Sequence, residues 1–60
     1  MTTYSIQVSG SHNELWTDLP ATEVQPHYDA VIENAKYEGC GVVLNVHDGF
    51  FSMTLITTQL

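Results

Sequence analysis

Residues 41–57 read GVVLNVHDGFFSMTLIT, two apolar-rich runs on either side of Asp48-Gly49. An Asp-Gly pair suits a two-residue type I′ turn, in which both turn residues have positive φ, so this stretch predicts a β-hairpin. Counting outward from that turn pairs His47 with Phe50 and Val46 with Phe51. One face of the hairpin is then wholly apolar and consists of Val42, Leu44, Val46, Phe51, Met53 and Leu55. An isolated hairpin is marginally stable in water, so this face requires a cover from the rest of the chain.

A helix from about residue 22 to about residue 38 is expected to supply the cover. Its apolar residues recur at helical spacing and form one stripe: Val24, Tyr28, Val31, Ile32 and Ala35. Thr22 followed by Gln25 matches a capping box, and a start with Pro26 as the first helical residue is the alternative. Gly39 is suited to end the helix in a left-handed conformation.

The N-terminal third of the chain predicts two further strands. Residues 3–9 alternate between apolar and polar side chains, which is typical of a half-buried strand. Residues 14–19 are expected to return as a second strand with Leu15, Thr17 and Leu19 inward and Trp16 outward; an extended loop is the alternative. The fold class is therefore α+β, a single domain in β-β-α-β-β order: a small antiparallel sheet of three to four strands with one helix packed on one face.

The charge balance limits the kinds of partner. The 60 residues contain seven acids and a single base, Lys36, giving a net charge of −6. Phosphate backbones are bound by several lysines and arginines together, so direct nucleic-acid binding is excluded, and docking on an anionic membrane with it. A protein partner, basic in character, is compatible with this charge.

Cys40 is the only cysteine, so no internal disulfide can form. A reduced thiol in the cytoplasm of the producing or host cell is the simplest interpretation, with an intermolecular disulfide as the alternative. The N-terminus lacks the pattern of a signal peptide, and no stretch is long and apolar enough to span a bilayer.

The sequence predicts no catalytic, cofactor or metal site. The candidate metal ligands have no paired spacing and fall on different elements: His12, His27, His47, Cys40 and Asp48. A nucleophilic Cys40 assisted by His47 is disfavoured, because the negative end of the helix dipole opposes formation of a thiolate.

Two surfaces are candidates for binding a partner. The first is the sheet face opposite the helix, where the predicted strand phases place a group of large side chains: Trp16, Val43, His47, Phe50 and Ile56. The alternative is that the N-terminal segment or residues 57–60 cover this face. The second is the outer face of the helix, where Asp29, Glu33 and Tyr37 could hold a basic partner; a plain solvated helix face is the alternative.

These observations favour a non-enzymatic, acidic protein-binding module that inhibits or regulates a host protein. In size, acidity and α+β make-up the chain is similar to the small inhibitors that bacteriophages encode, a viral class of protein. The alternatives are a self-associating assembly subunit, such as a homodimer, and an inhibitor that mimics nucleic acid with its carboxylates.

Overall fold

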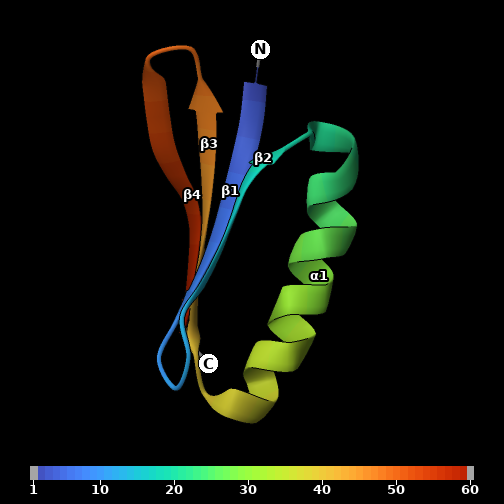
Figure 1. Cartoon of the computed structure of the whole chain (residues 1–60), viewed down its shortest axis with the longest axis vertical. Helices are drawn as coiled ribbons and strands as arrows, with labels where there is room; N and C mark the ends of the chain where they lie inside the picture. Colours follow the sequence, from blue (N-terminus) through green and yellow to red (C-terminus); the bar gives the residue numbers. More distant parts are fainter. Residues whose placement is uncertain (1, 60) are drawn as a thin grey trace.

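The computed structural model describes residues 2–59 as one antiparallel sheet with a single helix. The elements are β1 (Thr2–Ser9), β2 (Glu14–Leu19), α1 (Ala21–Glu38), β3 (Gly41–Asp48) and β4 (Phe51–Gln59). The strands lie in the order β2-β1-β3-β4, and α1 runs along one side of the sheet (Figure 1). The predicted α+β class, with four strands in β-β-α-β-β order, is confirmed.

The core lies between the helix and the two central strands. Its fully or almost fully buried members come from all three elements and from the junction before β3: Ile6, Val8, Val31, Ala35, Cys40, Val42 and Leu44. Ile6 pairs with Leu44 and Val8 with Val42, so these side chains share the face that meets the helix. The predicted apolar stripe of the helix is confirmed, because its remaining members pack at the margin of this core.

The two ends of the helix differ in how well they were predicted. Gly39 ends α1 in the left-handed conformation, with φ of 68° and its N–H donating to the Ala35 carbonyl at 2.9 Å, as expected. The predicted capping box is wrong. Pro20 occupies the N-cap position, so Thr22 already lies within the helix and makes no cap, and Pro26 is accommodated inside the helix.

The hairpin turn lies one residue further along the chain than predicted. Asp48 pairs with Phe51, which leaves Gly49 and Phe50 as the two turn residues. Only Gly49 has positive φ (63°), as in turns of type II′, where glycine takes the first central position. Val46 consequently pairs with Met53 rather than Phe51. The shift is two residues along β4, so the side chains next to the turn keep their predicted faces.

A β-bulge at Leu55 changes the faces in the second half of β4. Asn45 pairs with Thr54 and Leu44 with Ile56, so Leu55 is the extra residue. Beyond it Ile56 lies on the helix side of the sheet, beside Leu44, and the prediction that Ile56 faces away from the helix is wrong.

A second irregularity, in β2, lies between two residues that both face the helix, Trp16 and Leu19. Trp16 pairs with Ile6 and therefore lies on the helix side, whereas Leu15 pairs with Gln7 on the opposite face and is 62% exposed. The predicted orientations of both residues are wrong. The register then shifts, Asp18 adopts a positive φ of 58°, and Leu19 returns to the helix side opposite Tyr4. The irregularity lets Trp16 and Leu19, three positions apart, both face the helix.

The C-terminal tail does not fold over the sheet as far as it is described. Residues 57–59 continue β4, and Leu60 lies outside the described residues. Within residues 2–59, α1 lacks the length of apolar sequence needed to cross a membrane.

Two glycines provide a test of the backbone geometry. A Cβ at Gly49 would meet nothing within 4 Å, so Gly49→Ala should cost only the backbone strain, about 1 kcal/mol of unfolding free energy. Gly10 has φ of 138°, and its Cβ would approach the Cys40 Cα to 3.2 Å. Gly10→Ala should therefore cost about 2–3 kcal/mol. Urea denaturation of both variants measures the difference, and equal costs would contradict the close approach of Gly10 to Cys40.

Candidate functional site

The sheet face opposite the helix is mostly polar, although Leu15 and the predicted Val43 also lie on it. Ser5 and Ser52 hydroxyls lie 2.9 Å from the two ring nitrogens of His47, and Thr54 donates a hydrogen bond to the Asn45 side chain at 2.7 Å. This array replaces the predicted cluster of large apolar side chains, because Trp16 and Ile56 both lie on the helix side. His47 does lie on this face, and its hydrogen bonds explain it as part of the sheet. Its role in binding a partner stays a prediction.

Exposed apolar side chains gather instead on the helix side of β4. Phe51, Met53 and Ile56, here called the β4 strip, pair with Asp48, Val46 and Leu44 and are 59%, 49% and 44% exposed. The helix packs on β1 and β3, so it leaves this strip uncovered. Next to the strip, Phe50 is fully exposed at the hairpin turn and Leu55 is exposed in the bulge. Phe50 is thus exposed, but it lies in the turn, and the prediction that it belongs to the sheet face opposite the helix is wrong.

The backbone of β4 is also open. Among residues 2–59 the strand pairs only with β3, so its other side forms an edge of the sheet. Residues 51–59 contain no charged side chain. Edge strands of monomeric proteins are usually protected by charges, prolines or a covering element, because an open apolar edge is a template for another strand. In β4 such protection consists of the bulge at Leu55 and, near the end of the strand, the Tyr28 hydroxyl of α1, which lies 3.2 Å from the Thr58 hydroxyl.

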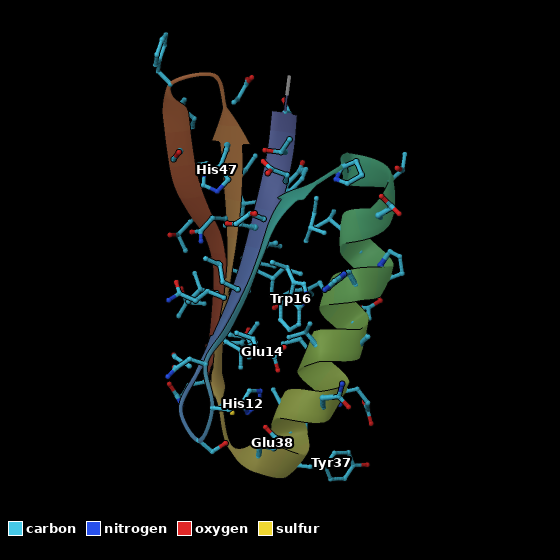
Figure 2. All side chains as sticks on the ribbon, viewed as in Figure 1. His12, Glu14, Trp16, Tyr37, Glu38 and His47 are labelled. Carbon is cyan, nitrogen blue, oxygen red and sulfur yellow. The ribbon has the colours of Figure 1, made fainter. Side chains whose placement is uncertain are left out.

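Trp16 forms part of a groove between β2 and α1. Its ring meets that of His27 edge to face, with centroids 5.0 Å apart, and it points from β2 toward the helix (Figure 2). The groove has a volume of about 310 Å³, and its lining combines apolar residues with His12, Glu14, His27 and Asn34. Its size lies at the lower end of the range for small-molecule sites. Trp16 therefore both supports the helix and lines the groove.

A cluster of polar side chains lies at the end of the molecule away from the hairpin turn (Figure 2). His12, in the turn between β1 and β2, contacts Glu38 through Nδ1 at 2.5 Å and Glu14 through Nε2 at 3.0 Å. The buried Cys40 Sγ lies 3.9 Å from His12 Nδ1 and 3.8 Å from a Glu38 carboxylate oxygen. Sequence reasoning named His12 and Cys40 but missed Glu38, since nothing in the spacing connects residue 12 to residues 38–40.

The predicted electrostatic surface on the helix is exposed. Asp29 accepts a hydrogen bond from Gln25 at 3.0 Å, and Glu33 pairs with Lys36 at 3.4 Å. Tyr37 projects into solvent near the end of α1, far from the hairpin turn (Figure 2). These side chains therefore form no continuous surface with Phe50. Both the binding role and the interpretation as a solvated helix face stay open.

Comparison with protein-family models, with curated proteins and with solved structures finds no match for this chain.

Substitution of the two predicted aromatic anchors should separate their roles. Trp16→Ala removes packing against the helix and the core, so it should lower the unfolding free energy by about 2 kcal/mol. Phe50→Ala removes a fully exposed ring and should change stability by less than about 0.5 kcal/mol. Thermal and urea denaturation of both variants provide the measurement. A neutral Trp16→Ala would show that Trp16 does not support the helix.

Proposed function

We propose that this protein is a non-enzymatic protein-binding module that docks through the edge strand β4. The observation that carries the proposal is the β4 strip: three large exposed apolar side chains along an uncharged edge strand, in a domain whose other core-facing apolar side chains are buried or half-buried. Contiguous exposed apolar surface on a small domain usually marks a site of association.

The docking mode that fits this surface is strand addition. An extended segment of the partner pairs with the open backbone of β4, which supplies hydrogen bonds that do not depend on side-chain identity. Specificity then comes from the β4 strip on the helix side and from Phe50 at the turn. Large apolar and aromatic side chains of this kind commonly carry most of the binding free energy.

The charge distribution favours a basic partner. The seven carboxylates belong to β2, α1 and the end of β3, and none lies within residues 51–59. The net charge of −6 attracts a basic protein over a distance, while the uncharged edge forms the contact without burying a carboxylate. A module that occupies a strand of a host protein in this way acts as its inhibitor or regulator.

Self-association through the same edge is the second candidate function. Two copies of β4 related by a two-fold axis would pair antiparallel and bring their β4 strips together. The absence of charge in residues 51–59 favours this arrangement, because no carboxylates are forced into contact. Light scattering over a dilution series distinguishes the two candidates, since only self-association gives a mass that depends on concentration.

A charge placed in the β4 strip should abolish docking. Met53→Lys puts an ammonium group at the centre of the strip, where a partner would have to desolvate it, so partner capture or dimer formation should be lost. Because Met53 is half exposed, the unfolding free energy should change by less than about 1 kcal/mol. The measurement is affinity capture from the native host together with light scattering.

Leu15→Lys is the matched control for this experiment. Leu15 is similarly exposed but lies on β2, the opposite edge of the sheet, so its substitution should leave binding unchanged. Equal binding by the wild type and Met53→Lys, or loss of binding in Leu15→Lys alone, would refute docking through β4.

A further inference from the structure

Three potential metal ligands converge where the turn between β1 and β2 meets the junction of α1 and β3. They are His12 Nδ1, a carboxylate oxygen of Glu38 and Cys40 Sγ, and all three atoms lie within 4.8 Å of one another. The nitrogen comes from the turn between β1 and β2, and the oxygen and the sulfur come from the junction of α1 and β3, which is distant along the chain. Their convergence is therefore a product of the fold and is invisible in the spacing of the sequence.

We propose that His12, Glu38 and Cys40 bind a zinc ion. Imidazole, carboxylate and thiolate are the three side-chain types that bind Zn²⁺ in proteins. With the thiol proton released to solvent, the thiolate and the carboxylate carry two negative charges, which balance the charge of the ion. Three protein ligands leave the fourth tetrahedral position to water. The proposal does not depend on docking through the β4 strip, which pairs with residues 44–48 of β3 rather than with its start.

The distances are close to those that zinc requires. Tetrahedral zinc, with bonds of about 2.0–2.3 Å, places its ligand atoms roughly 3.3–3.6 Å apart. Cys40 Sγ lies 3.9 Å from His12 Nδ1 and 3.8 Å from Glu38 Oε2, so these gaps need to close only slightly. His12 Nδ1 and Glu38 Oε2, which are 2.5 Å apart, must separate to admit the ion. The Glu38 side chain is 45% exposed and can make that movement.

The groups around the three ligands match the surroundings of a metal centre. His12 Nε2 lies 3.0 Å from Glu14 Oε1, and a hydrogen bond donated from Nε2 to that oxygen would leave the Nδ1 lone pair for the ion once Glu38 moves. The Ser11 hydroxyl lies 3.3 Å from Cys40 Sγ and can donate a hydrogen bond to a thiolate. A histidine held between a metal and a carboxylate is a recurring arrangement in zinc sites.

A protonated His12 shared between Glu14 and Glu38 is the competing explanation of the cluster. It accounts for the two carboxylates and leaves Cys40 as a buried core thiol that donates a hydrogen bond to Glu38 at 3.8 Å. A bound zinc ion would explain why all three ligand atoms converge on one point. Because the ion would join the turn between β1 and β2 to the junction of α1 and β3, its binding would also stabilise the fold.

Zinc titration of the metal-free protein tests the proposal. The wild type, titrated in competition with a chromophoric chelator, should bind one zinc ion per chain and gain thermal stability as zinc is added. Cobalt(II) in place of zinc should give a thiolate-to-cobalt charge-transfer band, which Cys40→Ser should abolish. Absence of the band in the wild type, or failure to bind zinc at micromolar concentration, would overturn the site.

Two variants distinguish direct ligation from a merely acidic surface. His12→Gln removes a ligand at a partly exposed turn, so the fold should survive, as circular dichroism can verify, while zinc affinity falls most. Glu14→Gln removes only the carboxylate behind the imidazole and should lower affinity by about 10–100-fold. His47→Gln is the matched control and should bind as the wild type does, since His47 lies at the opposite end of the sheet (Figure 2). Equal affinities of His12→Gln and His47→Gln would refute the proposal.

Discussion

The packing of one helix on four strands determines what the rest of this molecule exposes. The apolar stripe of α1 meets β1 and β3, the two central strands, and there it buries Ile6 and Val42 completely. A single helix is about 10 Å across, so it covers about two strands at their usual spacing. The two edge strands are therefore left in different states: β2 borders a groove beside the helix, and β4 carries uncovered apolar side chains.

The elements could be predicted from the sequence because their signals are local. Helical spacing of apolar residues, the left-handed Gly39 and the Asp-Gly region each depend on a few neighbouring residues. The sequence could not show which face of the sheet a side chain occupies beyond an irregularity. A bulge adds one residue to a strand and reverses the alternation of side chains after it. The bulge at Leu55 moved Ile56 to the helix side. In β2, both alternation phases offer a large apolar residue inward, Leu15 in one and Trp16 in the other, so the alternation alone could not decide between them.

The polar cluster around His12 could not be predicted either, and the reason is the separation of its members along the chain. His12 is separated from Glu38 and Cys40 by the whole of β2 and α1, and only the antiparallel return of the chain brings the β1–β2 turn beside the start of β3. Gly10 allows this approach, because its missing Cβ leaves room for the Cys40 backbone at the point of contact. The sequence shows the residue types, but their proximity depends on the order of the strands in the sheet.

The distribution of charge along the sheet separates the two regions for which binding is proposed. Carboxylates at both edges of a sheet would oppose the approach of any further strand, whereas here Glu14 and Asp18 lie on β2 and none lies on β4. Glu14 and Glu38 gather around His12, where negative charge favours a cation, and the uncharged residues 51–59 present a surface that a strand can join without desolvating an ion. A small domain can thus keep a large net charge and still offer an apolar edge, because the charge is confined to elements that the edge does not include.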